Sequence, residues 1–210
     1  MYTLYFSPGT ASMLPHLVLL EAGAAHELRA VNLSAGAQRE PEYLKLNPNG
    51  VVPTLIVDGV PTSEAASLAL LLAERHPEAR LAPAPGSVHR STFLQWMFYL
   101  ANSLQPAFRL WWYPQEAGDG VPTEVAKAGA QKRIEAIWTR IDEHLAANGP
   151  YLLGDTFSVA DLYVTMLMRW SRNMPREALH WPHLAALAQR VRERASWKKL
   201  YEIEGLTEWA

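Results

Sequence analysis

The sequence predicts an α/β domain followed by an all-α domain, and three observations support this prediction. Strand-like runs alternate with helix-like runs only before residue 76. Residues 77–87 are rich in proline and glycine, which is typical of a boundary between domains. Beyond residue 88 only helical patterns remain. We therefore expect an N-terminal α/β domain over 1–76, a linker over 77–87 and an all-α helical domain over 88–210.

The elements of the N-terminal domain are predicted from turn and cap residues. The first strand ends at Pro8-Gly9, and the first helix ends before Gly23, a residue type common just after helices. Asp58-Gly59 between two short apolar runs favours a hairpin. The predicted elements are strand 2–6, helix 11–22, strand 26–32, a short helix near 41–46, strands 54–57 and 60–62, and helix 64–75. Their order, β-α-β-α-β-β-α, is that of a thioredoxin-like domain.

The helical domain is predicted from apolar periodicity and from helix-breaking residues. Pro106 should kink or end the first helix because it lacks a backbone N–H. Ser158 and Asp161 match a capping box with Asp in place of the usual Glu, and Phe157 with Leu162 match a hydrophobic staple. The expected helices cover roughly 88–113, 123–147, 158–173, 182–195 and 196–204.

The composition excludes several classes of function. A formal net charge of −2 gives no basic face for nucleic acid. Without cysteine, the protein has no disulfide, no thiolate metal site and no cysteine redox chemistry. The seven histidines are scattered except for His180 and His183, so no metal site is expected. The longest apolar run, residues 65–73, is too short to cross a bilayer, and no secretion signal is recognisable, so we expect a cytoplasmic protein.

The most informative segment is NPNGVVPTL at residues 47–55, which is followed by Glu64-Ala65. X-Pro is the only peptide link that adopts cis at low cost, and a cis Val52–Pro53 bond would leave the Val52 N–H and C=O unpaired with the protein's own sheet. They could then pair with an extended peptide, as in strand addition. Glu64 opens a helix whose first N–H groups would attract a carboxylate or a phosphate. Together these features predict a site for a small, anionic, peptide-like molecule.

These motifs, with YTLYFSPG at residues 2–9, resemble those of a soluble glutathione transferase, most closely the bacterial beta-like branch. The resemblance implies a homodimer that adds the glutathione thiolate to a small hydrophobic electrophile, with glutathione as co-substrate and no metal. It also implies that Val52 and Pro53 bind the glutathione backbone. Glu64 would take the γ-glutamyl ammonium group, and the Ala65 N–H would take the γ-glutamyl carboxylate.

The glutathione thiol must be held ionised to act as a nucleophile. A hydroxyl donor and the positive end of a helix would both favour the thiolate. Ser12 could supply both, with Thr10 as a neighbouring competitor, or could merely cap the helix. Tyr5 is a second candidate hydroxyl, although strand alternation could equally bury it. The beta-like branch has a cysteine beside this serine, and Ala11 stands there in this chain, which excludes a mixed disulfide at that position.

The pocket for the second substrate is expected on the first long helix and the loop after it. An aromatic cluster there would suit an apolar electrophile, although aromatic residues at helical spacing are also typical of a core. The candidates are Phe108, Arg109, Trp112 and Tyr113. Where the beta-like branch has a His and a Lys on this helix, the chain has Gln105 and Pro106. These departures keep two alternatives open: a non-catalytic binding module with this fold, or a glutathione-dependent isomerase or dehalogenase.

Overall fold

The computed structural model describes residues 1–209. The chain divides into two compact units: residues 1–82 together with the segment from Arg192 onward, and residues 83–191. The first unit therefore includes the last helix of the chain. This division differs from the sequence-based expectation, which places everything after residue 88 in one helical domain.

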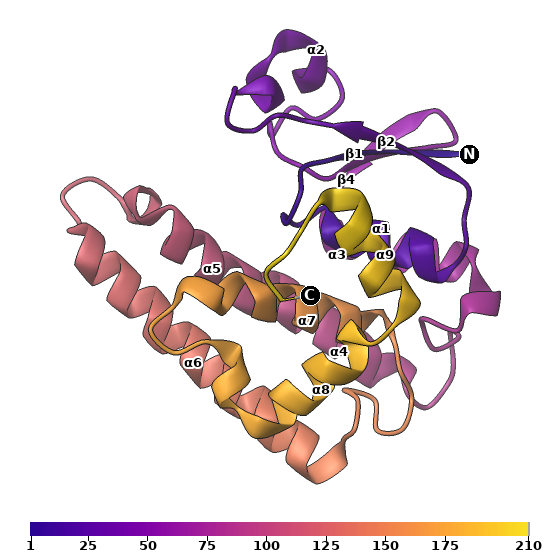
Figure 1. The fold of residues 1–210 in the computed structure, drawn as a ribbon, viewed down its shortest axis with the longest axis vertical. Helices are drawn as coiled ribbons and strands as arrows, with labels where there is room; N and C mark the ends of the chain where they lie inside the picture. The colour runs from indigo at the N-terminus through magenta and orange to yellow at the C-terminus, as the bar shows by residue number, and fades with distance from the viewer. Residues whose placement is uncertain (210) are drawn as a thin grey trace. The chain divides into compact units, whose positions relative to one another are not determined.

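The N-terminal unit is built on a four-stranded mixed sheet with the strand order β2-β1-β3-β4. The strands are β1 (Tyr2–Phe6), β2 (His26–Ala30), β3 (Thr54–Val57) and β4 (Val60–Ser63), and the helices are α1 (Met13–Glu21), α2 (Pro41–Leu44), α3 (Ala65–Arg75) and α9 (Ala195–Glu204). β1 and β2 are parallel, and the other two pairs are antiparallel. The predicted order β-α-β-α-β-β-α is confirmed, including the short second helix. Helices α1 and α3 lie on one side of the sheet and α2 lies on the other (Figure 1).

Alternation along β1 decides which side chains face these helices. Leu4 is fully buried and Phe6 is nearly so, and the Phe6 ring lies 6.1 Å from the ring of His16 on α1. Tyr5 therefore points to the opposite face, because successive side chains of a strand alternate. There it packs against a small cluster of Val31, Tyr43 and Val52. The sheet thus has a core face covered by α1 and α3 and a second face with the α2 region.

The helical unit contains α4 (Arg90–Tyr99), α5 (Gln105–Trp112), α6 (Thr123–Asn148), α7 (Val159–Trp170) and most of α8 (Pro182–Arg192). The single helix expected over 88–113 is divided by a π-helical turn, Leu100–Leu104. Pro106 follows directly in the first turn of α5, where its missing N–H leaves the backbone ladder interrupted. In the part of the chain that the structure describes, no helix is long and apolar enough to span a membrane.

The predicted capping box at the start of α7 is confirmed. The Ser158 N–H donates to the Asp161 carboxylate at 2.8 Å, and the Ser158 hydroxyl accepts from the Ala160 N–H at 3.3 Å. Asp161 also accepts from the Leu152 N–H at 2.8 Å. Burial raises the pKa of Asp161 to about 6, although these hydrogen bonds act in the opposite direction. The carboxylate therefore joins the preceding loop to the helix at a fully buried position.

Candidate functional site

Three segments of the N-terminal unit meet at one edge of the sheet. Tyr5 near the end of β1 pairs with Thr54, the first residue of β3, and Thr54 pairs with Ser63, the last residue of β4. Because these residues form one row across the sheet, the segments next to the row lie at the same edge. These segments are the loop 7–12, Val52–Pro53 and Glu64.

The Val52–Pro53 peptide bond is cis, as the sequence predicts. Val52 precedes β3, and neither its N–H nor its C=O has a hydrogen-bond partner among residues 1–209. This matches the expectation that the Val52 backbone is not paired with the protein's own sheet. Such a segment offers one donor and one acceptor to an extended ligand.

A buried polar network holds the chain just before Val52. The Tyr43 hydroxyl and the Asn47 side-chain amide both donate to the Val51 carbonyl, each at 2.8 Å. Both groups also contact the Thr54 hydroxyl, at 2.9 and 3.2 Å. Burial chiefly raises the pKa of Tyr43, so the phenol stays protonated and remains a donor. Asn47 and Thr54 belong to the sequence motif at residues 47–55, although no role for the Thr54 hydroxyl is predicted from it. Tyr43 lies outside the motif and has no sequence signal of its own.

Glu64 has an unusual backbone conformation, with φ 72° and ψ 104°. A non-glycine residue with positive φ stores about 1–3 kcal/mol of strain and is found preferentially at binding sites. The Glu64 side chain is exposed and makes no hydrogen bond or ion pair within the described chain. The N–H groups of Ala65 and Ala66, at the start of the eleven-residue helix α3, have no partner in residues 1–209 either. An unpaired carboxylate thus stands beside unpaired helix N–H groups.

The Ser12 hydroxyl is directed into the protein. It donates to the Ser7 carbonyl at 3.0 Å, accepts from the Ser7 N–H at 3.2 Å and lies 2.9 Å from the Thr10 hydroxyl. Ser12 is fully buried and makes no capping bond to α1. The role expected for it, direct donation to a sulfur atom, would require these bonds to break. In this structure, Ser12 instead stabilises the loop that follows β1.

The donor that remains free in this loop is a backbone group. The Thr10 hydroxyl donates to the Ser7 carbonyl at 2.8 Å or to Ser12, so its proton is also used within the loop. The Ala11 N–H has no partner among the described residues, and Ala11 is half-buried. The sequence shows at Ala11 only the absence of a cysteine, because an unpaired backbone N–H has no sequence signal.

Tyr5 is not brought to the start of α1. Its ring packs edge-on against Tyr43 with 5.9 Å between centroids, and the Arg29 guanidinium lies 5.9 Å from the ring centre. Tyr5 belongs to the sheet face opposite α1, as the burial of Leu4 and Phe6 shows. The sequence predicts that Tyr5 either donates its hydroxyl to the thiol or packs against the sheet, and the structure favours packing.

The aromatic cluster of the helical unit separates into core and surface residues. Phe108 is fully buried and packs against Trp138 and Trp170, with centroid distances of 6.0 and 5.9 Å. The expectation that Phe108 lines a substrate pocket is therefore corrected, because its side chain is not accessible in this structure. Trp112 and Tyr113 are 40 and 48 % exposed.

Arg109 is engaged in a surface ion pair. Its guanidinium makes two hydrogen bonds to Glu116, at 2.6 and 2.5 Å, and lies 5.2 Å from the Tyr113 ring centre. Gln105 accepts from the Tyr163 hydroxyl. Both side chains therefore have partners inside the helical unit.

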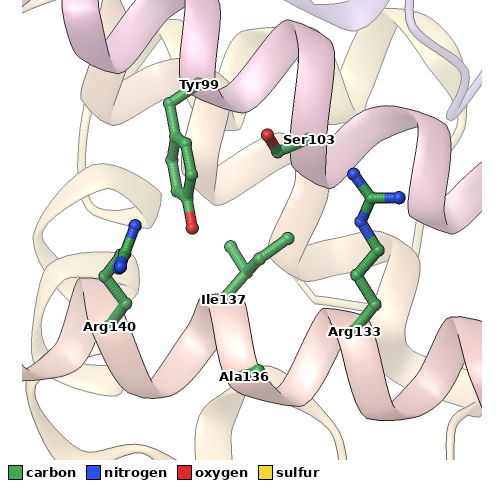
Figure 2. Close-up of a pocket in the computed structure, with 6 residues that line it drawn as sticks. All are labelled: Tyr99, Ser103, Arg133, Ala136, Ile137 and Arg140. Carbon is green, nitrogen blue, oxygen red and sulfur yellow. The ribbon is translucent and has the colours of Figure 1, made fainter.

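A pocket of about 260 Å³ lies between α6 and the segment joining α4 to α5. It is lined by Tyr99, Ser103, Arg133, Ala136, Ile137 and Arg140. Figure 2 shows the Tyr99 side chain pointing from its helix toward α6, with Arg140 and Arg133 on the two sides of Ile137. None of the residues predicted from the sequence lines this pocket, so it carries none of the roles expected from the sequence.

Two sequence profiles match the chain. Residues 12–75 match the glutathione S-transferase N-terminal domain, and residues 102–202 match the glutathione S-transferase C-terminal domain. The first match includes Val52, Pro53 and Glu64 of the sheet-edge site, and the second includes the helices from α5 to α8.

Individual proteins match over nearly the whole chain. The chain is 28 % identical to the glutathione S-transferase GstA of Escherichia coli O157:H7, covering 97 % of this chain and 98 % of that protein. A sphingomonad glutathione S-transferase solved in complex with glutathione is 30 % identical, with a TM-score of 0.86 over 98 % of this chain and all of that one. A beta-class glutathione S-transferase from Sphingomonas chungbukensis is 28 % identical, with a TM-score of 0.85 over 98 % of this chain and 100 % of that one.

Proposed function

Because this chain belongs to the glutathione S-transferase family, we propose that it conjugates the thiolate of glutathione to a small hydrophobic electrophile. One observation carries the proposal. The register row of Tyr5, Thr54 and Ser63 puts an unpaired backbone, an unpaired carboxylate and unpaired helix N–H groups at one edge of the sheet. Glutathione is an extended anionic peptide with a cationic amine at one end, and it has a complementary group for each of these.

The proposed binding mode assigns one ligand group to each segment. The Val52 N–H and C=O pair with the cysteinyl backbone of glutathione, beside Pro53. Glu64 binds the γ-glutamyl ammonium group, and the Ala65 N–H binds the γ-glutamyl carboxylate at the positive end of α3. Arg39 lies against Gly50 and has no ion-pair partner in the described chain, so it is available for the glycyl carboxylate at the other end.

The chemical step requires an ionised thiol. With the hydroxyl protons of Ser12 and Thr10 used inside the loop, the Ala11 N–H and the positive end of α1 are the groups proposed to stabilise the thiolate. Ser12 then acts by holding the loop, and Tyr5 by packing. This assignment needs neither a cysteine nor a histidine from the protein. The thiolate attacks an electrophilic carbon and forms the C–S bond. In a substitution the bond to the leaving group breaks and that group departs as an anion; in an addition the π bond breaks and the resulting carbanion takes up a proton from solvent.

The second substrate is proposed to be held by exposed aromatic surface of the helical unit, with Trp112 and Tyr113 as candidates. Arg109 supports Tyr113 through its position over the ring. We also propose a homodimer, as the family resemblance implies. Light scattering tests this directly, and a mass near that of one chain, 23.5 kDa, contradicts it.

Calorimetric titration with glutathione is the test of the proposed function. We expect binding by the wild-type protein and at least about tenfold weaker binding by Glu64→Ala, since one hydrogen bond between charged groups is worth about 1.5–3 kcal/mol and about 1.4 kcal/mol is tenfold in affinity. Glu42→Ala is the matched control, because Glu42 is another exposed glutamate of this unit and is paired with Lys45. No binding by the wild type at millimolar glutathione would overturn the enzyme reading and favour a binding module.

Turnover of Ser12→Ala tests the assignment of the thiol donor. If Ser12 only holds the loop, the variant loses stability and activity together, and glutathione binding persists at low temperature. A Ser12→Ala variant with wild-type stability and a strongly reduced turnover number would instead identify the hydroxyl as the thiol donor, as the sequence suggests.

A further inference from the structure

Two contacts tie the last helix of the chain to α1. Before the start of α9, Arg194 makes a bidentate ion pair with Glu21, at 2.6 and 2.7 Å, and Ser196 donates to the same carboxylate. At the end of α9, Glu204 Oε1 lies 2.8 Å from His16 Nδ1. The side chains of this second pair are fully buried.

The second contact also reaches the loop that follows β1. The other oxygen of Glu204, Oε2, accepts a hydrogen bond from the Gly9 N–H at 2.9 Å. Gly9 has φ 72°, a conformation that favours glycine, and it lies two residues before Ala11. One buried carboxylate therefore joins α9, α1 and the loop that carries the free Ala11 N–H.

This arrangement is a costly way to pack two helices. A carboxylate loses its hydration when it is buried, and an apolar pair of similar size usually packs as well or better. The His16 ring nitrogen that faces away from Glu204, Nε2, is also buried and has no partner. His26 is the next titratable side chain, with its ring centroid 5.7 Å from that of His16. Unlike an apolar pair, the Glu204 carboxylate makes directional hydrogen bonds: one oxygen holds the Gly9 N–H and the other contacts His16 Nδ1.

We propose that Glu204 is a positioning residue for the thiol site: it holds the Gly9 N–H and thereby fixes the Thr10–Ala11 turn against the start of α1. This inference rests on the proposed glutathione transferase function. The Ala11 N–H and the helix end must lie at a fixed place to stabilise the sulfur anion, since such stabilisation depends on preorganised donors. Without Glu204 the turn can shift, and the bound thiol then ionises at higher pH.

Two substitutions at Glu204 separate geometry from charge. Glu204→Ala removes both acceptors. Glu204→Gln keeps them in a different form: its amide oxygen accepts from Gly9, and its NH₂ donates to His16 Nδ1. This requires the His16 proton to move to Nε2, which is free to carry it. We therefore expect Glu204→Gln to restore the loop that Glu204→Ala loses.

Glu21→Gln is the control for a merely structural effect. It weakens the other tie between α1 and α9, to Arg194 and Ser196, but leaves the Gly9 contact intact. We expect both Glu204→Ala and Glu21→Gln to lower the melting temperature. Only Glu204→Ala should affect the loop.

The decisive readout is the pKa of the thiol in the bound state, followed through the ultraviolet absorbance of the thiolate as pH is varied. We expect Glu204→Ala to raise this thiol pKa by about one unit, which lowers the rate roughly tenfold below that pKa. Below the pKa of the bound thiol, the glutathione dissociation constant, set by Glu64 and Val52, should stay nearly unchanged. Amide hydrogen exchange at residues 9–12 should be faster in Glu204→Ala and near wild-type in Glu204→Gln.

The outcomes separate this inference from the proposed function. If the wild type binds glutathione but Glu204→Ala keeps the wild-type thiol pKa, or shifts it only as much as Glu21→Gln does, the positioning role is wrong and the proposed function stands. If the wild type does not bind glutathione, the proposed function fails and the role at a thiol site fails with it. Exchange at residues 9–12 then still reports whether Glu204 holds the loop.

Discussion

The hydroxyl of Tyr43 lies 2.9 Å from the hydroxyl of Thr54, and it donates at the same time to the Val51 carbonyl. Tyr43 belongs to α2, and Thr54 is the first residue of β3. The contact between them therefore joins α2 to the start of β3, on the sheet face opposite α1 and α3. The segment that presents the unpaired Val52 backbone is therefore anchored in part by Tyr43, which lies outside the motif that predicts it.

Tyr43→Phe tests this anchor. The substitution leaves the Val51 carbonyl with one donor, Asn47, and removes a buried hydrogen bond, so we expect unfolding to become about 1–2 kcal/mol easier by urea titration. Glutathione binding should weaken as well, because Val52 loses its fixed position. Tyr2→Phe, which removes a bond to His76, should lower stability slightly without affecting binding.

Gly50→Ala tests why the motif has glycine at this position: because of the positive φ, or because a Cβ would collide with neighbouring atoms. Gly50 has φ 59°, and a Cβ there would lie 3.0 Å from the Gln38 carbonyl oxygen. Gly59 also has positive φ, 81°, but a Cβ there meets nothing within 4 Å. Both alanine variants should lose about 1–2 kcal/mol to backbone strain. We expect Gly50→Ala to lose more free energy of unfolding than Gly59→Ala, and the difference measures the clash with Gln38. Equal losses for the two variants in chemical denaturation would show that there is no clash.

Glu64→Gly should separate stability from binding. Glycine adopts the positive φ of residue 64 without strain, so we expect the free energy of unfolding of Glu64→Gly to be about 1 kcal/mol higher than that of the wild type. Glu64→Gln keeps the strain and should leave stability unchanged. Both variants should bind glutathione more weakly. A Glu64→Gly protein that is less stable than Glu64→Gln would contradict the presence of strain.

The pKa of Asp161 gives a pH dependence with a definite sign. Because burial raises the folded pKa to about 6, the native state binds more protons than the unfolded state between about pH 4 and 6. The contribution of Asp161 to stability therefore increases as pH falls through this window, by up to about 3 kcal/mol. Asp161→Asn should be less stable throughout and should lack this contribution. A constant stability difference between the two proteins from pH 7 to 4 would refute it.

Glu21 should behave in the opposite way. Burial raises its pKa, but hydrogen bonds from Arg194 and Ser196 and the Arg194 charge outweigh this and lower the pKa overall. Its stabilising contribution is therefore present above the unfolded pKa, about 4.5, and is lost as pH falls through the folded pKa. Comparing the wild type with Glu21→Gln in thermal melts between pH 7 and 3 should show the difference shrinking toward acid.

The sequence predicts the fold well wherever local signals decide it. Turn glycines, the Ser158–Asp161 capping box and the X-Pro link at Val52 are local, and the structure has all three. Pro106 was expected to interrupt a helix, and the interruption is a π-helical turn just before it.

The sequence predicts the site less well because side-chain direction depends on the packed structure. Ser12 is at the expected position, but its hydroxyl bonds to Ser7. Phe108 has the spacing of both a pocket wall and a core residue, and packing against Trp138 makes it core. Glu204 could not be found from sequence, since its partner Gly9 lies 195 residues away.

The place of α9 in the N-terminal unit has a consequence for how the protein is made. The sheet and the loop 7–12 emerge from the ribosome first, but His16 and Glu21 meet their partners only when Glu204 and Arg194 have been synthesised. The whole helical unit is translated in between. The N-terminal unit is thus translated first but completed only at the end of synthesis. A chain that stops shortly before α9 would lack the carboxylate that accepts from the Gly9 N–H in the loop 7–12.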